Sequence, residues 1–446
     1  MIRTNQLPPI AGVVLGITFY EVGNTFQYII QPVFFPTFFR LLGFLCTLYF
    51  IIKSSKQRLS RDVSIWFSIL LVWTIIMFLR GSLIGNFAPG TDTSFRGIIQ
   101  RALLSPYGPF AFFLPFIVYI SISNNSLYYL KKLAILLCFI SLFTSFTFRT
   151  EILNGLTYQG LTSMIGVEGD EVTVRHLIGA LYPGFGLILF MLFCFNYIKG
   201  KVSYLFPIAI FVFFLSNAIG GGRSQTGLNL SYLLLFFFVI IRYPINRNRK
   251  SSFRMLKNIS YLLMFCAFVF IIYYLYESTT TFDYVLERAF GNKAMEGDFI
   301  NDSREILRND MIKDFNEHPL SWLWGRGVNG AYRTQHLSIG GYRMWMEWGY
   351  LYLIIKGGII YLSLYVYLML HAAYMGFFRS NNSFSKSLAV MCIVYLLNLV
   401  SPGSEPQFST LFLLSWICFG LLERRQFRMM NDEMIYGYFN VKNFNI

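Results

Sequence analysis

The amino-acid sequence predicts an all-α polytopic membrane protein with about twelve transmembrane helices and one large extracytoplasmic loop. Of the 446 residues, 55% are hydrophobic and only 13% are charged, whereas soluble domains contain about 25% charged residues. Apolar runs of about 20 residues, the length that crosses a bilayer as a helix, recur along the chain. Basic residues gather in every second loop, as the positive-inside rule requires.

The apolar runs give the order of the elements. The candidate spans are residues 10–30, 33–52, 63–80, 107–122, 129–148, 176–198, 203–218, 227–242, 258–276, 347–372, 386–402 and 406–422. They divide the chain into helices 1 to 9 with short loops (1–276), a large periplasmic loop (277–346), and helices 10 to 12 with a tail (347–446). The first run has one basic residue before it and no small-residue cleavage site, which argues against a cleavable signal peptide.

The net charge of +15 follows from topology. With the N-terminus placed in the cytoplasm, the cytoplasmic segments hold 21 of the 37 Lys and Arg residues but only 4 of the 22 Asp and Glu residues. Positive charge is retained on the cytoplasmic side of membrane proteins. We therefore expect both termini to be cytoplasmic and no nucleic acid to bind.

The large loop contains one clear helical pattern, DSREILRNDMIKDFNEHP (302–319). Asp302 or Ser303 can cap its start, and Pro319 stands just past its end. Ile306, Met311 or Ile312, and Phe315 recur at helical spacing, so the helix has one apolar face. A glycine-rich turn, WLWGRGVNG (322–330), follows directly.

Arginine predominates among the basic residues outside the cytoplasmic segments, with thirteen arginines against three lysines. Its planar fork binds phosphate bidentately, which favours anion recognition on the outer face. Arg223 follows three glycines and opens a helix, Arg326 lies between two glycines, and Arg304 lies in the first turn of the loop helix. Exposed backbone N–H groups at such places can also bind phosphate. The alternative is that each arginine simply pairs with a loop carboxylate.

Two charges fall inside the predicted spans, Glu21 in the first and Arg40 in the second, at similar depth. An unpaired charge at the bilayer centre costs about 2.5–3.5 kcal/mol, so we expect the two to pair, either structurally or as part of a substrate path. No H-E-x-x-H or Walker A pattern occurs, so no metal, nucleotide or other cofactor is expected.

Three stretches resemble the O-antigen polymerase and O-antigen ligase superfamily. LSNAIGGGRSQTGLNLSYLLLFFF (215–238) resembles its Ser-Arg-Gly element, SREILRNDMIKDFNEHPLSWLWGRGVNG (303–330) its large periplasmic segment, and GYLYLIIKGGIIYLSLYVYL (349–368) its closing helix. The likeness covers residues 203–422 and rests on the order and placement of these motifs. The ligases carry His-Asn where this sequence has Glu347-Trp348, which favours a polymerase.

The resemblance implies a glycosyltransferase of the bacterial inner membrane that joins oligosaccharide repeat units carried on undecaprenyl pyrophosphate, for O-antigen, capsule or exopolysaccharide. It implies membrane lipid and a chain-length regulator protein as partners. Arg223, Arg304 and Arg326 would stabilise the leaving pyrophosphate, and Glu347 or His336 would act as general base. An O-antigen ligase-type glycan transferase and a polysaccharide flippase or transporter are the alternatives.

Overall fold

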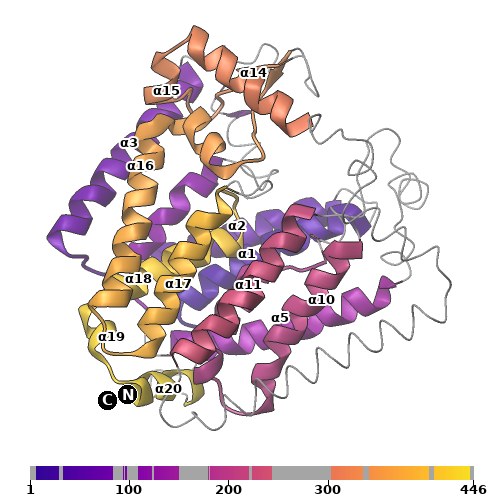
Figure 1. The fold of residues 1–446 in the computed structure, drawn as a ribbon, viewed down its shortest axis with the longest axis vertical. Helices are drawn as coiled ribbons and strands as arrows, with labels where there is room; N and C mark the ends of the chain where they lie inside the picture. The colour runs from indigo at the N-terminus through magenta and orange to yellow at the C-terminus, as the bar shows by residue number, and fades with distance from the viewer. Residues whose placement is uncertain are drawn as a thin grey trace.

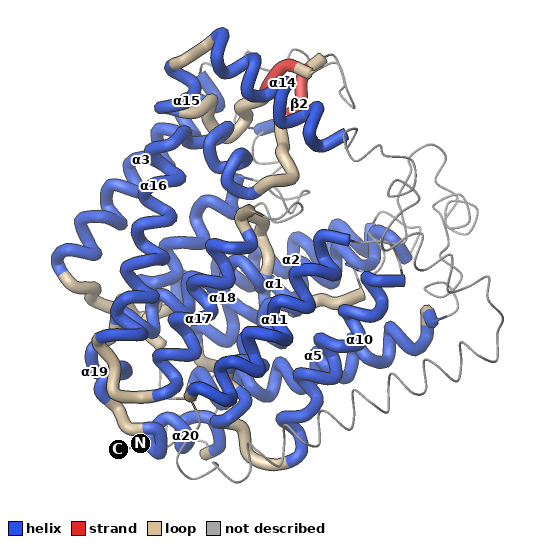
Figure 2. The backbone as a smooth tube through the Cα atoms, in the orientation of Figure 1, coloured by secondary structure: helices blue, strands red, loops and turns tan. Residues whose placement is uncertain are grey.

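A computed structural model describes most of the chain, and its described part is predominantly helical (Figure 2). The described residues are 7–29, 34–83, 94, 96–97, 109–122, 125–149, 179, 181–219, 223–243, 303–334, 341–400 and 406–441. The predicted span 258–276, most of the loop 277–346 before Ser303, and His336 lie outside them.

The helices up to the large loop are α1 (Pro9–Ile29), α2 (Phe34–Lys53), α3 (Arg61–Leu83), η1 (Pro109–Tyr119), α5 (Ser126–Thr147), α9 (Phe185–Phe193), η2 (Phe195–Tyr197), η3 (Lys201–Tyr204), α10 (Leu205–Ile219) and α11 (Arg223–Arg242). The later elements are α14 (Ser303–Glu317), α15 (Leu320–Trp324), β1 (Tyr332–Arg333), β2 (Tyr342–Arg343), α16 (Gly349–Phe378), α17 (Ser383–Asn398), α18 (Thr410–Glu423), α19 (Arg425–Met429) and α20 (Asp432–Asn440).

The helices run up and down between two ends of a bundle, with α14 and α15 at one end and α19 and α20 at the other (Figure 1). Several predicted cytoplasmic segments meet at the α20 end. Arg424 donates to Gln57 and to the carbonyl of Ile122. Asn382 donates to the carbonyls of Phe427, Arg428 and Met430. The backbone N–H of Lys199 donates to the side chain of Asn440. The predicted basic segments that the structure describes therefore share one end of the bundle, whereas the predicted basic cluster at 247–257 lies outside the described residues.

Four described helices are long and apolar enough to cross a membrane: α2, α3, α5 and α16. These four establish the coarse prediction of a helical membrane protein, while the count of twelve stays a prediction. Three predicted spans contain shorter elements than expected. In the span predicted at 107–122 the described residues Pro109–Tyr119 form the 3₁₀ helix η1, the span predicted at 176–198 contains the nine-residue α9, and the span predicted at 406–422 corresponds to the 14-residue α18.

The short elements have local causes. Pro115 lies inside η1 and lacks the N–H that an α-helix would use. Before α9, Pro183 precedes Gly184, which has a φ of 74° and caps the helix; a proline and a left-handed glycine both interrupt a helix that would otherwise start earlier. At about 1.5 Å per residue, α9 is only about 14 Å long, well short of a bilayer core of about 30 Å.

Glu21 of α1 joins the starts of α9 and α18. Its carboxylate accepts the N–H of Gly184 at 2.8 Å and the N–H of Thr410 at 2.9 Å, and the Thr410 hydroxyl lies 3.1 Å from both of its oxygens. First-turn N–H groups lack partners within a helix and carry the positive end of its dipole. One partly buried carboxylate therefore accepts hydrogen bonds from the starts of two helices.

The predicted Glu21–Arg40 pair is wrong. Arg40 is buried, with 7% of its surface exposed, and its Nε donates to Asn24 Oδ1 at 2.7 Å. Within the described chain, the partners of Glu21 are backbone and hydroxyl groups of other helices. Sequence depth alone could not show that two helices start beside Glu21 and compete for it.

Candidate functional site

The described part of the large loop folds against α3 and α16 around one apolar helix face. In α14, Leu307, Met311 and Phe315 are at most 2% exposed, so the predicted helix is confirmed, with Leu307 rather than Ile306 in its core. The helix begins at Ser303 and ends at Glu317, two residues before Pro319. Behind it, β1 and β2 form an antiparallel pair in which Tyr332 faces Arg343 (Figure 2); the sequence did not predict this hairpin.

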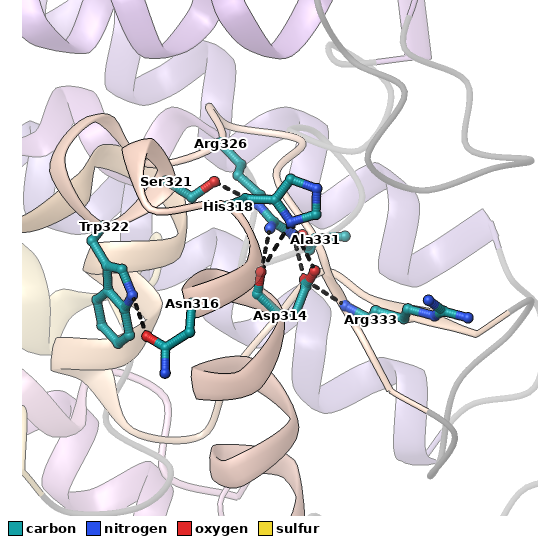
Figure 3. Close-up of polar contacts among 8 residues, drawn as sticks. All are labelled: Asp314, Asn316, His318, Ser321, Trp322, Arg326, Ala331 and Arg333. Atoms are coloured by element: carbon teal, nitrogen blue, oxygen red, sulfur yellow. Dashed lines mark hydrogen bonds and ion pairs between the residues drawn. The ribbon is translucent and has the colours of Figure 1, made fainter.

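Arg326 is buried at the centre of this subdomain, with 2% of its surface exposed. Its Nη1 forms an ion pair with Asp314 and donates to the carbonyl of Ala331 at 2.8 Å, and its Nε donates to the Ser321 hydroxyl at 3.1 Å (Figure 3). The guanidinium also lies 4.5 Å from the centre of the Phe315 ring. Its surroundings match the structural alternative, an arginine paired with a loop carboxylate, rather than an open phosphate ligand.

Asp314 holds more than Arg326. Its Oδ2 also accepts the N–H of Arg333 at 2.9 Å, which fixes the start of the hairpin against α14. Ligand atoms of Asp314, Glu317 and His318 lie within 4.8 Å of one another, a spacing that could hold a metal ion. A cation there would have to compete with the guanidinium for the one buried carboxylate, so we assign this group to the scaffold.

The loop Gly325–Gly327 docks where α16 is interrupted. Gly358 has a φ of 73°, which breaks the helix and leaves the carbonyls before it without helical partners. The N–H of Arg326 donates to the Ile355 carbonyl at 2.7 Å and that of Gly327 to the Lys356 carbonyl at 2.9 Å. The indole of Trp73 in α3 donates to the third, that of Gly357, at 2.8 Å. The N–H groups of the loop therefore satisfy backbone carbonyls of α16 that lack partners within the helix.

The glycines at this junction are required by space. A Cβ on Gly325 would stand 2.5 Å from the Gly358 nitrogen and the Lys356 carbonyl oxygen, and one on Gly358 would stand 2.1 Å from the Leu323 oxygen. Lys356, 2% exposed, donates from Nζ to the Gly330 carbonyl at 2.8 Å. Two of the stretches that carry the family resemblance, 303–330 and 349–368, thus pack directly on each other.

Glu347, the predicted general base, lies beside Arg343, and two arginine–tryptophan contacts are formed by residues of this region. Its Oε1 is 3.9 Å from Nη2 of Arg343, and its side chain is 29% exposed. The Arg343 guanidinium lies 5.4 Å from the Trp345 ring centre, and that of Arg308 lies 5.9 Å from the Trp348 ring centre. We call Arg308, Tyr332, Arg343, Glu347 and Trp348 the outer cluster.

Arg343 differs from Arg326 in how its donors are used. Its Nε donates to the Trp345 carbonyl at 3.2 Å, while its two Nη groups make no hydrogen bond within the described residues. A guanidinium has five N–H donors, so Arg343 retains N–H groups that could donate hydrogen bonds to an oxyanion. The 3.9 Å separation from Glu347 is an ion pair without a close hydrogen bond.

The hydroxyl of Tyr332 is buried in the outer cluster without a hydrogen-bond partner among the described residues. Burial raises the pKa of Tyr332, and Arg343, Asp310 and Glu347 act on it electrostatically. The hydroxyl is therefore protonated at neutral pH. A buried hydroxyl without a partner costs free energy, and a water or a bound ligand can supply the missing hydrogen bond.

The remaining predicted site residues are placed only in part. Arg223 is the first residue of α11 and Arg304 lies in the first turn of α14, as predicted, but their side chains and His336 lie outside the described residues. Sequence reasoning selected Glu347 but did not single out Arg308, Tyr332 or Arg343. The spacing of Arg343 and Glu347, four residues apart with Trp345 between them and Trp348 directly after, was the available signal.

Comparisons of the chain with protein-family models, with curated proteins and with solved structures find no match.

Proposed function

We propose that the protein is a polysaccharide polymerase, a glycosyltransferase that joins undecaprenyl-pyrophosphate-linked repeat units at the outer face of the bacterial inner membrane. The observation that carries the proposal is the junction of 303–330 with 349–368. The two resembling stretches pack together through Gly325–Gly327 and the break at Gly358. The outer cluster lies beside this junction, at the start of α16.

In the proposed reaction, an acceptor sugar hydroxyl attacks the anomeric carbon of the donor chain. A new C–O bond forms and the bond from that carbon to the pyrophosphate oxygen breaks, so the carrier pyrophosphate leaves with the electron pair. Glu347 accepts the proton of the attacking hydroxyl, which requires a carboxylate within hydrogen-bond reach of the acceptor; its side chain is partly exposed, at 29%. The products are the lengthened chain on the acceptor's carrier and free carrier pyrophosphate.

The arginines of the outer cluster supply the countercharge. Negative charge develops on the departing pyrophosphate, and preorganised donors stabilise it without reorganising. Arg343 fits this role because its Nη groups are not committed to hydrogen bonds within the described chain. Arg308 lies 5.9 Å from the ring centre of Trp348, the residue that follows Glu347. Arg223 and Arg304 keep their proposed role from the sequence, whereas Arg326 is assigned to the scaffold.

Half-length helices are the feature that favours the second candidate, a flippase or other transporter. Such proteins bind anionic substrates at the starts of interrupted helices near the middle of the membrane. Here the starts of α9 and α18 converge, but Glu21 already occupies their N–H groups. A protein carboxylate at this place leaves less room for a substrate anion, so we rank the transporter below the polymerase.

The test is the glycan profile of a strain that lacks this chain, complemented with the native sequence or with Glu347→Gln. Loss of a polymerase leaves surface lipid capped by a single repeat unit, because transport and ligation of one unit continue. We expect that pattern in the deletion and in Glu347→Gln, with the variant at normal abundance. Long chains accumulating on the carrier would instead identify a ligase, and single units trapped on the cytoplasmic side would identify a flippase.

A further inference from the structure

The exposed surfaces of α14 and α15 differ in polarity, although the two helices are adjacent in sequence. On α14 the exposed side chains include Asn309, Lys313 and Glu317. On α15, Leu320 is 73% exposed, Leu323 45% and Trp324 40%. Large apolar side chains gathered on one exposed side mark a surface that contacts another apolar phase.

The depth of α15 follows from its contacts with α3. The ring of Trp324 stacks on Trp73 with centroids 5.1 Å apart, its carbonyl accepts from Arg80 at 3.2 Å, and the Val328 N–H donates to the Met77 carbonyl at 3.1 Å. Residues 73–80 belong to the stretch Arg61–Arg80 that can cross the membrane. They cover about 10 Å at about 1.5 Å per residue. The end of α15 and the following loop thus lie beside the final third of a membrane-spanning helix (Figure 1).

A different face of α3 carries exposed apolar side chains. Val72, Ile75 and Leu79 recur every three or four residues and are 56%, 46% and 52% exposed. On a membrane-spanning helix, such a stripe faces lipid. Helix α3 therefore contacts lipid on one face and α15 on another, at the same depth.

The backbone here also satisfies the condition that lipid imposes. Irregular backbone at membrane depth is tolerated only where its polar groups are bonded within the protein. The N–H groups of Gly325, Arg326, Gly327 and Val328 donate in turn to the carbonyls of Ser321, Ile355, Lys356 and Met77. Four consecutive N–H groups therefore need no water.

We propose that α15 and the loop Gly325–Val328 form a re-entrant segment whose Leu320, Leu323 and Trp324 side chains contact bilayer lipid in the leaflet at the α14 end. The segment predicted as part of an aqueous periplasmic loop enters the membrane and returns. This fixes the depth of the junction with α16 and holds the outer cluster near the membrane surface. The inference does not depend on which glycan reaction the protein catalyses.

The test is spin labelling of the full chain in nanodiscs of phosphatidylglycerol and phosphatidylethanolamine. Single cysteines at Leu320 and Leu323 carry the label, and the signal of the chain without added cysteine is subtracted. Ile75→Cys is the lipid-facing reference, and Lys313→Cys on α14 is the aqueous reference. All four positions are exposed, so the substitutions leave the packing intact. Collision of each label with oxygen, which concentrates in lipid, is compared with collision with a water-soluble nickel chelate.

We expect the oxygen-to-nickel ratio at Leu320 and Leu323 to exceed that at Lys313 several-fold and to resemble that at Ile75. A ratio like that at Lys313 at both positions would place α15 in water and overturn the proposal. Low collision with both reagents would show that protein covers α15, which overturns it equally. Because two positions are labelled, a poorly expressed variant at one of them still leaves a decisive result.

Discussion

Arg326 and Arg343 are both buried in the same small subdomain, at 2% and 9% exposure, yet their side-chain donors are used differently. Arg326 is 2% exposed and its fork is engaged by Asp314, Ser321 and the Ala331 carbonyl. Arg343 has one side-chain hydrogen bond, from Nε, and a carboxylate 3.9 Å away. The first is held by short contacts to one buried carboxylate, and the second lies next to a half-exposed one.

The difference shows that a glycine-flanked arginine does not by itself indicate a phosphate site. The glycines beside Arg326 serve a close backbone approach to α16, and its side chain turns inward to pair with α14. Arg343 has no glycine beside it in sequence, yet it keeps donors for a ligand. Which arginine binds an anion is therefore decided by the saturation of its donors, which only tertiary structure reveals.

Removing Arg326 should have the largest effect. Arg326→Ala leaves Asp314 as a buried carboxylate without its counterion, a change that costs about 3–5 kcal/mol. We expect a matching fall in the free energy of unfolding in detergent and low abundance in the membrane. The control is Arg333→Ala, an exposed arginine of the same hairpin whose backbone, not its side chain, contacts Asp314. Equal stability of the two variants would refute the scaffold role.

A substitution at Gly358, where α16 is interrupted, tests the helix side of the junction. Gly358→Ala places a Cβ 2.1 Å from the Leu323 oxygen at a φ of 73°, and strain plus overpacking should cost about 2–5 kcal/mol. Thermal unfolding measures it. The matched control is Gly227→Ala in α11, where a Cβ meets nothing within 4 Å and alanine should stabilise the helix by up to about 1 kcal/mol. Equal melting temperatures of the two variants would contradict this prediction.

Substitutions in the outer cluster should separate function from stability. Arg343→Lys keeps the charge but loses the planar fork, and we expect the yield of long glycan chains to fall by about 10- to 100-fold, the worth of a hydrogen bond to a charged group. Abundance and melting temperature should stay at native values. A loss of abundance that parallels the loss of long chains would place Arg343 in the scaffold with Arg326.

The smallest change is Tyr332→Phe, which deletes only the buried hydroxyl. Because this hydroxyl has no partner among the described residues, stability should stay equal or rise by up to about 1 kcal/mol. Activity should fall about 2- to 10-fold if the hydroxyl bonds to the cluster once substrate is present. Chain-length profiles and thermal unfolding of the same preparation give both values. Destabilisation would mean that the hydroxyl already has a partner in the free protein.

The sequence predicted the features that depend on local pattern. The helical membrane fold, the gathering of the basic loops at one end, α14 with its final Pro319, and the start of α11 at Arg223 all follow from periodicity, charge or capping. It did not predict the short α9, because an apolar run looks continuous even where Pro183 and Gly184 delay the helix.

Long-range pairing was beyond the sequence. Glu21 forms hydrogen bonds with residues 163 and 389 positions away in the sequence. Arg326 pairs with Asp314 of α14, while the backbone of its loop bonds to α16. Charge and depth suggested Arg40 as the partner of Glu21, but backbone N–H groups were the donors nearby. Glu347 was selected by alignment with a ligase motif, whereas its neighbour Arg343 required the fold of β2 against β1.

Binding of a lipid pyrophosphate tests the contrast between the two arginines most directly. The full chain in nanodiscs is titrated with farnesyl pyrophosphate, with farnesol as the control without phosphate, for the native protein, Arg343→Ala and Arg326→Lys. The account predicts that Arg343→Ala weakens pyrophosphate binding by about tenfold or more at an unchanged melting temperature. It predicts that Arg326→Lys melts earlier, while its folded fraction binds like the native protein. Native affinity in Arg343→Ala, or lost affinity in Arg326→Lys at native stability, would contradict it.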